Sequence, residues 1–247
     1  YITLQHIIET ITGQSLRDFA KENIFDILGM QYTDYLPTIQ QQDGKWINTV
    51  ACPWMDRIAP TEKQKDGSVL CGQVHDPLAR ILNGGISGNA GIFSNANDIG
   101  ILAAALLNGG EYNGHRILSP LGVKTMCTVP RELTAFGRTP GWDIFSPYAS
   151  NKGDLFSPNT FGHTGYTGTS IIIDPDNDTA VILLVNAVHP EDRHSIVRLR
   201  SLVANAVAAS ICPPAQVYTD HYYKRFLQFE TETPISPKDI VMVGNSL

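Results

Sequence analysis

The chain has 247 residues, enough for one sizeable core or for one domain with part of a second. Hydrophobic residues make up 43% and charged residues 17%, a composition that excludes a disordered chain. The net charge of -6 and the lack of a Lys/Arg cluster exclude a nucleic-acid partner, because such binding needs a concentrated basic face. The longest apolar runs, 99–107 and 180–185, are too short to cross a bilayer, so we expect no membrane span.

The chain begins at Tyr1 without an initiating Met or a leader with a cleavage site, so we expect this start to be a cut. Apolar residues from Ile2 to Ile11 then recur at helical spacing and stop at Gly13, which predicts that the first segment is a helix. Ser15 can cap a second helix. We expect this second helix to fray before Gly29.

Residues 31–82 form an irregular stretch rich in Asp, Gly, Pro and Gln. It is too long to be an ordinary connection, and loops of this length usually carry function. Residues 83–91 then place four glycines in nine positions. Two interpretations remain: a tight turn, or a close approach of the backbone to another segment.

Asn95 or Asn97 can cap a strongly apolar helix over residues 99–107. The sequence at 112–114 predicts the turn of a short hairpin. Another helix is predicted from Ser119, which acts as the cap and is followed by a proline at the first helical position.

Residues 169–173 and 180–186 are β-branched, apolar segments on either side of a polar turn at 174–178. This pattern predicts an antiparallel hairpin. After Pro190, apolar residues at helical spacing predict a long helix that ends at Pro213. The predicted fold class is α/β (α+β), with a helix packed on a sheet.

The segment 161–170 leads into this hairpin and combines three glycines, one imidazole and several hydroxyl groups. Glycine lets a ligand approach a strand closely, and the His163 and Thr164 side chains can hydrogen-bond a carboxylate or carbonyl oxygen. Taken alone, His-Thr-Gly favours the structural start of a strand. A strand edge that holds a substrate is the alternative.

The motifs around this segment resemble those of the class C β-lactamase and penicillin-binding-protein family, which includes esterases. The motifs are Val74-His75-Asp76-Pro77, the glycine-rich run 84–94, Leu107-Asn108-Gly109-Gly110, Gly141-Trp142 and His163-Thr164-Gly165. They stand in the family's order within residues 1–212, which we assign to one domain whose N-terminal part is missing. The resemblance implies a β-lactamase/transpeptidase-like fold, an antiparallel sheet flanked by helices.

In that family a serine in Ser-x-x-Lys attacks a carbonyl and a Tyr motif assists proton transfer. The sequence has no Ser-x-x-Lys, and the resemblance puts both motifs before Tyr1. It implies that the Tyr166 backbone N–H is one oxyanion donor. It also implies that four residues orient the substrate: His163, Thr164, Gly165 and Thr167. Without its nucleophile, the chain alone is expected to be inactive.

The leading hypothesis is therefore a fragment of a serine hydrolase that, in the intact parent, cleaves an ester, amide or β-lactam through an acyl-serine. The alternative is a non-catalytic peptide- or glycan-binding module on the same fold. The resemblance implies a small-molecule or peptidoglycan-like substrate and an extracytoplasmic location, in the bacterial periplasm or at the cell surface.

The four cysteines stand at long, irregular spacings: Cys52, Cys71, Cys127 and Cys212. This pattern resembles neither a zinc site nor a dense disulfide framework. We expect buried thiols, with a bridge between Cys52 and Cys71 as the alternative. Several histidines also lack partners at metal-ligand spacing, so we expect no metal and no cofactor.

The last 35 residues have a different character. Residues 213–235 are aromatic and charged, and predict a linker with an aromatic helix. Residues 236–247 hold a buried-strand pattern that runs into Gly-Asn-Ser-Leu. This end resembles the first block of SGNH (GDSL-type) esterases, which implies Ser246 as a nucleophile of a second domain. An ordinary strand end is the alternative.

Overall fold

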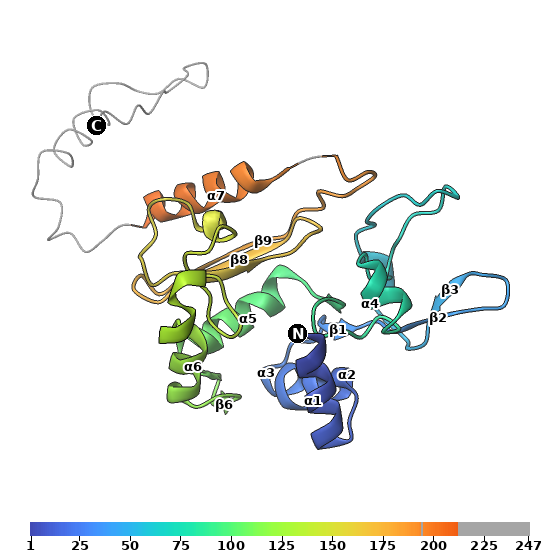
Figure 1. Ribbon diagram of the computed structural model, residues 1–247, viewed down its shortest axis with the longest axis horizontal. Helices are drawn as coiled ribbons and strands as arrows, with labels where there is room; N and C mark the ends of the chain where they lie inside the picture. Colours follow the sequence, from blue (N-terminus) through green and yellow to red (C-terminus); the bar gives the residue numbers. More distant parts are fainter. Residues whose placement is uncertain (194, 212–247) are drawn as a thin grey trace, which may run out of the picture. The chain divides into compact units, whose positions relative to one another are not determined.

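The computed structural model describes residues 1–193 and 195–211 (Figure 1). The chain divides into two units, Tyr1–Ala208 and Ala209–Leu247. Almost all described residues belong to the first unit. Several predicted features lie outside the described residues: the linker over 213–235, the strand over 236–247, Cys212 and Ser246.

The N-terminal helices begin and end where their capping residues stand. Helix α1 (Ile2–Thr12) ends at Gly13, whose φ of 70° is left-handed, and Ser15 caps α2 (Leu16–Ala20) by accepting from the Asp18 N–H. The predicted fraying is wrong. The helix continues through a π-helical turn, η1 (Lys21–Phe25), into α3 (Asp26–Leu28). The segment stays helical because its inward-facing residues belong to one buried core cluster. The cluster includes Leu16, Ala20, Phe25, Leu28 and Met30.

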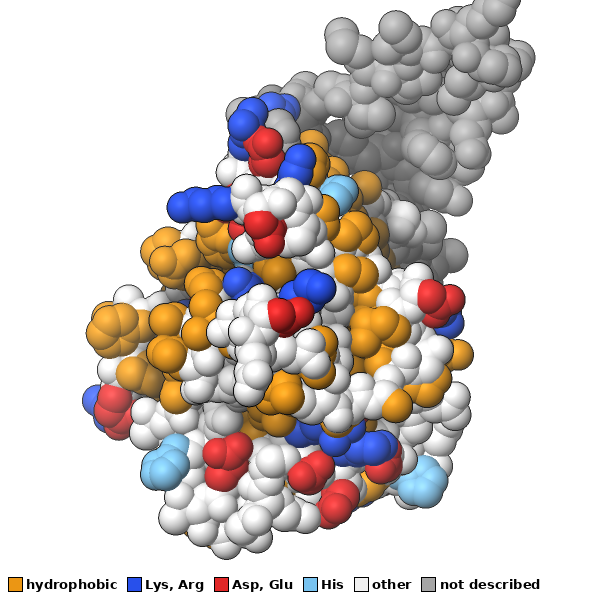
Figure 2. Space-filling model, turned by 90° about the vertical axis from the view of Figure 1, so that its right-hand side faces the viewer, with side chains coloured by type: hydrophobic (Ala, Val, Ile, Leu, Met, Phe, Trp, Pro, Cys, Tyr) orange, Lys and Arg blue, Asp and Glu red, His pale blue; other side chains and the backbone are white. Residues whose placement is uncertain are grey.

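The apolar face of α1 lies largely at the surface. Leu4 is 53% exposed and Ile11 is 77% exposed, whereas Ile8 packs against the core cluster. Large apolar side chains are exposed elsewhere as well. On the face drawn in Figure 2, groups of hydrophobic side chains lie among charged and uncharged polar ones. The helical period in this segment therefore predicted the helix correctly, although most of the periodic face is not buried.

The stretch expected to be irregular, residues 31–82, contributes three short strands to two small antiparallel sheets. Strand β1 (Asp34–Tyr35) pairs with β4 (Ile92–Phe93), and β2 (Thr38–Gln40) pairs with β3 (Trp46–Asn48). A 3-10 turn, η2 (Met55–Arg57), and a short helix, α4 (Pro77–Ile81), complete it.

The glycine-rich run combines both interpretations made from the sequence. The Gly85 backbone has a φ of 86°, and an added Cβ would lie 3.0 Å from the Leu36 carbonyl oxygen. At Gly91, with a φ of 125°, an added Cβ would lie 2.6 Å from the Gly85 carbonyl oxygen. The run is thus a tight turn whose backbone also packs closely against the β1–β2 connection.

The middle of the chain follows the predicted order. Asn95 caps α5 (Ala96–Leu107) through the Asp98 N–H, which decides between the two cap candidates. The hairpin of β5 (Glu111–Tyr112) and β6 (His115–Arg116) turns at Asn113, with φ 49°. Ser119 caps α6 (Pro120–Cys127), and two 3-10 segments follow, η3 (Arg131–Phe136) and η4 (Ala149–Lys152).

The largest sheet formed by the described residues has three antiparallel strands in the order β7-β8-β9. These are β7 (Phe161–Thr164), β8 (Ser170–Asp174) and β9 (Thr179–Leu183), and α7 (Val197–Ser210) follows. Helix α5 packs against β9, and α5 and α7 lie on opposite sides of the β8–β9 hairpin in Figure 1. The predicted antiparallel sheet flanked by helices is confirmed.

The cysteines differ from the expectation of buried thiols. Cys52, Cys71 and Cys127 are free, and Cys71 is exposed, with its thiol donating to the Ile58 carbonyl at 3.3 Å. Burial raises the pKa of Cys127 to about 11. Within the described residues, no helix has the length and apolar character needed to span a membrane.

Candidate functional site

The His-Thr-Gly segment lies on its own strand rather than at the start of the hairpin strand. In β7, His163 pairs with Ile171 and Thr164 pairs with Ser170. The chain then reverses in a turn, which the Gly168 N–H closes by donating to the Gly165 carbonyl at 3.1 Å. Gly168 has a φ of 121°, a conformation that other residues rarely adopt, so glycine is needed where the chain turns into β8.

Two polar groups on this segment are available to a ligand. Among the described residues, neither the Tyr166 backbone N–H nor the Thr164 hydroxyl has a hydrogen-bond partner. Thr164, Gly165 and Thr167 are half-buried, and the Tyr166 side chain is 75% exposed. The predicted substrate-binding residues therefore lie together, at an accessible edge of the sheet.

Arg200, on α7, holds the turn in place through two hydrogen bonds. Its guanidinium donates to the Gly165 carbonyl at 2.8 Å and to the Thr169 carbonyl at 2.9 Å. Burial lowers the pKa of Arg200 below its ordinary value, although the group remains a cation at neutral pH. Beside it, the Ala187 N–H donates to the Thr167 carbonyl at 2.8 Å. The turn is thus held at both of its ends and at its tip.

His163 is held by Arg138, a residue that the sequence did not single out. The Arg138 Nη2 atom lies 3.0 Å from His163 Nε2. Since a guanidinium can only donate, Nε2 must accept, and the ring proton is then assigned to Nδ1, which donates to the Thr164 carbonyl at 2.8 Å. This network assigns one tautomer to His163, with the ring proton on Nδ1.

Asp143 completes this network. Its carboxylate lies 3.1 Å from Arg138 Nε, and its side chain is only 3% exposed. The Asp143 backbone pairs with Gly162 through hydrogen bonds of 2.8 and 3.0 Å, so this segment runs beside β7. The Trp142 ring packs on the Phe161 ring at 5.3 Å between centroids. The Gly141-Trp142 motif thereby places the counterion of Arg138 next to His163.

The Tyr166 ring makes two contacts of its own. It stacks on the His75 imidazole, with ring centroids 5.7 Å apart and planes 20° apart. Its hydroxyl donates to Asp192 Oδ2 at 2.5 Å. The hydrogen bond with Asp192, together with that residue's charge, raises the pKa of the Tyr166 phenol. His75 and Asp192 are site residues that sequence reasoning missed, although His75 belongs to a motif that carried the family resemblance.

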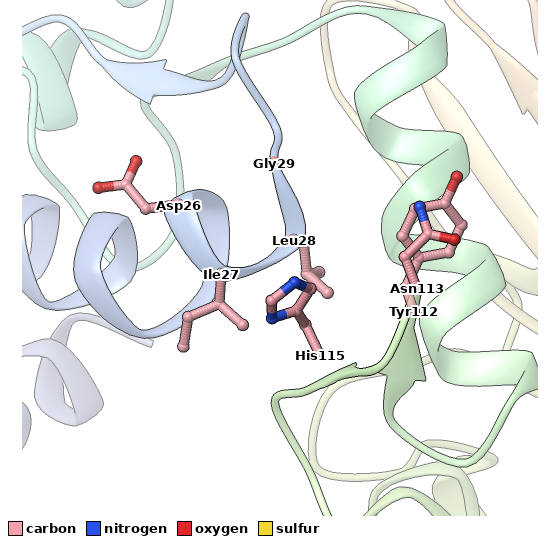
Figure 3. A pocket seen from close by; sticks show the side chains of 7 residues that line it. All are labelled: Asp26, Ile27, Leu28, Gly29, Tyr112, Asn113 and His115. Carbon is pink, nitrogen blue, oxygen red and sulfur yellow. The ribbon is translucent and has the colours of Figure 1, made fainter.

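Two shallow hollows lie elsewhere on the surface. One has a volume of about 340 Å³ and lies between the end of α3 and the β5–β6 hairpin (Figure 3). There His115 faces Leu28, whereas the Asp26 carboxylate points away from the His115 ring and pairs with Lys21. The other lies between η4 and α7, with a volume of about 590 Å³. Neither is lined by a residue of the His-Thr-Gly turn, so we place the candidate site at the turn itself.

The described residues offer no obvious metal site. Among them, no three His, Cys, Asp or Glu side chains are grouped so that they could hold a metal ion. The site consists instead of neutral donors at the end of a strand, with a fixed imidazole beside them. An antiparallel sheet that carries His-Thr-Gly before such a turn defines the class of β-lactamase-like serine hydrolase folds.

Comparison with known proteins gives the family. The chain belongs to the Beta-lactamase family, whose profile matches residues 1–205. Over 203 residues it is 36% identical to the "Putative D-alanyl-D-alanine carboxypeptidase" of Escherichia coli K12, an alignment that covers 76% of this chain and 44% of that protein. The chain thus spans less than half the length of this curated relative.

Solved structures agree on the fold. A β-lactamase from Mycobacterium bovis superposes with a TM-score of 0.54 and 19% identity, covering 85% of this chain and 62% of that one. A penicillin-binding-protein homologue from Caulobacter crescentus gives a TM-score of 0.51 and 17% identity, with coverage of 83% and 55%. The predicted family and fold are confirmed. The individual roles assigned to His163, Thr164, Gly165, Tyr166 and Thr167 stay predictions, and Ser246 lies outside the described residues.

Proposed function

We propose that this chain is the substrate-orienting part of a serine hydrolase that cleaves an ester, amide or β-lactam through an acyl-serine. The nucleophile belongs to sequence outside these 247 residues, since no serine here is followed three places later by Lys. One observation carries the proposal: the Tyr166 backbone N–H and the Thr164 hydroxyl have no partner among the described residues, on a turn that Arg200 and Ala187 hold in place.

In the proposed reaction, the Tyr166 N–H donates to the oxygen that becomes negative as the serine adds to the carbonyl. Such a donor accelerates the reaction because it is already oriented when the charge develops. The Thr164 hydroxyl orients the substrate's polar groups beside the turn. The His163 ring, bonded through its two nitrogens to Arg138 and to the Thr164 carbonyl, holds the end of the strand in place for the substrate. Thr167, at the tip of the same turn, and Gly165, which lets the ligand approach the backbone, complete the substrate-binding set.

The substrate class follows from the relatives. Because the matched Escherichia coli protein is named as a D-alanyl-D-alanine carboxypeptidase, we propose a peptidoglycan-like peptide as the substrate. Such a substrate is met outside the cytoplasm, so the proposed location is the bacterial periplasm or cell surface. A non-catalytic peptide- or glycan-binding module is the competing function.

A labelling experiment separates these functions. The longer protein that contains this sequence and the 247-residue chain are each exposed to a fluorescent penicillin and to a chromogenic ester. The longer protein is expected to become covalently labelled and to turn over the ester, whereas the chain alone does neither, because it lacks the nucleophile.

Two results would contradict this expectation. Covalent labelling of the 247-residue chain would overturn its predicted inactivity. A longer protein that neither labels nor turns over the ester, yet binds a peptidoglycan-derived peptide by calorimetry, would replace the hydrolase with the binding module.

A further inference from the structure

The Tyr166 side chain is exposed and yet has a defined place. The residue is 75% exposed, so burial does not fix the ring. It is fixed instead by the stacking on His75 and by the hydrogen bond from its hydroxyl to Asp192. An exposed tyrosine with no such contacts exchanges rotamers freely, so these two contacts determine where this ring lies.

His75 is a rigid support for the ring. Its side chain is only 13% exposed, and its Nε2 atom donates to Glu62 Oε2 at 3.1 Å. Its backbone carbonyl accepts from the Arg80 guanidinium at 3.1 Å. The next residue, Asp76, caps α4 by accepting from the Ala79 N–H at 2.7 Å. The imidazole is thus held from the backbone and from its far nitrogen.

The two supports of the ring belong to segments that are joined to each other. The Lys63 N–H donates to the Pro190 carbonyl at 2.8 Å, and His189 Nδ1 donates to the Thr61 carbonyl at the same distance. Glu62, which holds His75, therefore lies on a segment bonded to the one that carries Asp192. The ring of Tyr166 is held within a single connected frame.

We infer that His75 is a positioning residue for the oxyanion donor, acting through the Tyr166 ring. This inference rests on the proposed function. The ring and the backbone N–H share the Tyr166 Cα, so a fixed ring restricts the rotation of the turn that aims the N–H. An oxyanion donor must lie within about 2.7–3.1 Å of the developing charge, and a misplacement of about 1 Å costs up to a hundredfold in rate.

The kinetic test compares His75→Ala with His75→Phe in the longer protein. We expect His75→Ala to lower kcat for a chromogenic ester about tenfold with KM within about twofold, because the loss falls on the transition state. His75→Phe keeps an aromatic face for stacking and is expected to restore most of kcat. His115→Ala, at an exposed histidine of the β5–β6 hairpin, is the matched control and leaves both constants unchanged.

A thionoester distinguishes positioning of the donor from a general loss of structure. Sulfur accepts hydrogen bonds weakly, so an oxyanion donor contributes less to its reaction. His75→Ala should therefore slow the oxygen ester more than the matching thionoester. Equal losses for the two substrates, an unchanged kcat, or no rescue by His75→Phe would overturn the role of His75.

A measurement on the 247-residue chain keeps this inference separate from the proposed function. If the unmodified longer protein turns over neither substrate, the hydrolase proposal fails. The Tyr166 amide resonance of the 247-residue chain then shows, independently of activity, whether His75 positions that amide. His75→Ala should shift and broaden that resonance in the 15N–1H NMR spectrum, and His75→Phe should not. An unshifted Tyr166 amide in His75→Ala would mean that His75 does not position it.

Discussion

Arg138 connects a buried carboxylate to the imidazole of the His-Thr-Gly strand. Its Nε atom lies 3.1 Å from Asp143 and its Nη2 atom lies 3.0 Å from His163. A lysine cannot make both contacts, because an ammonium group lacks the planar fork of a guanidinium. The residue therefore stabilises the fold and orients the site with one group.

Arg138→Ala is expected to lower the free energy of unfolding of the chain. The change leaves the Asp143 carboxylate buried without its counterion, at a cost of about 1–3 kcal/mol, reduced because the Arg138 side chain is 35% exposed. Urea denaturation measures the loss. Arg138→Ala combined with Asp143→Asn, which removes the stranded charge, should recover part of it. A double variant no more stable than Arg138→Ala would argue against the charge as the cause.

Among the residues of the candidate site, the sequence predicted the ones that are adjacent along the chain and missed the ones that meet only in the folded structure. His163, Thr164 and Tyr166 lie in one segment, so their association needed no tertiary information. Arg138 and Arg200 are separated from the turn by 25 and 35 residues, and His75 is farther still. No local period or spacing marks such partners, because only the folded sheet brings them together.

The turn between β7 and β8 is the element on which the candidate site depends. Gly168 has a φ of 121°, and an added Cβ would lie 2.4 Å from the Val185 carbonyl oxygen. Gly168→Ala is expected to cost about 2–4 kcal/mol of stability, because both the dihedral and the contact are unfavourable. Gly141→Ala is the control, since its added Cβ would meet no atom within 4 Å. Thermal unfolding of the two variants should differ by several degrees; equal midpoints would show that the turn tolerates a side chain.

Asp174, in the β8–β9 hairpin, makes the free energy of unfolding of the chain depend on pH. Burial raises the pKa of this carboxyl, but hydrogen bonds from Ser157, Asn177 and the Asp176 N–H outweigh it, so the pKa lies below its usual range. A lowered pKa in the folded state means that the ionised group stabilises the fold above its unfolded pKa of about 3.9. That contribution disappears as the pH falls through the lower folded value.

Asp174→Asn tests this dependence. The amide cannot accept the same set of hydrogen bonds, so the variant should lose about 1–3 kcal/mol at pH 7. Its free energy of unfolding should then fall less steeply than that of the unmodified chain between about pH 5 and pH 2. Asp178→Asn, in the same turn but exposed and at φ 49°, serves as the control. Parallel pH profiles for the unmodified chain and Asp174→Asn would contradict the assignment.

Elements were predicted well where a cap or a turn residue marks their ends. Ser15, Asn95 and Ser119 cap helices as the sequence indicated. The second helix does end at Gly29, but the expected fraying before it is absent, because buried contacts hold the chain helical through a π-helical turn that local propensity does not favour. The separate strand β7 was missed for a related reason: glycine is unfavourable in isolated strands, and its partner β8 supplies the ladder that holds it.

For the molecule as a whole, composition predicted a folded chain and the order of its motifs predicted the family. The sequence did not predict that apolar residues of α1 would be exposed to the degree seen at Leu4 and Ile11. A periodic apolar face identifies a helix, but burial depends on what packs against it. The alignment with the curated Escherichia coli relative covers 44% of that protein.

The position of Arg200 in the sequence determines when, during synthesis, the candidate site can be completed. The turn that carries Tyr166 forms from neighbouring residues, but its Gly165 and Thr169 carbonyls receive their guanidinium only from a helix 35 and 31 residues later. A ribosome adds residues from the N-terminus onward, so the turn leaves the exit tunnel before α7 does. The His-Thr-Gly strand and its turn therefore reach their final geometry only after translation has passed Arg200, the residue that clamps the turn.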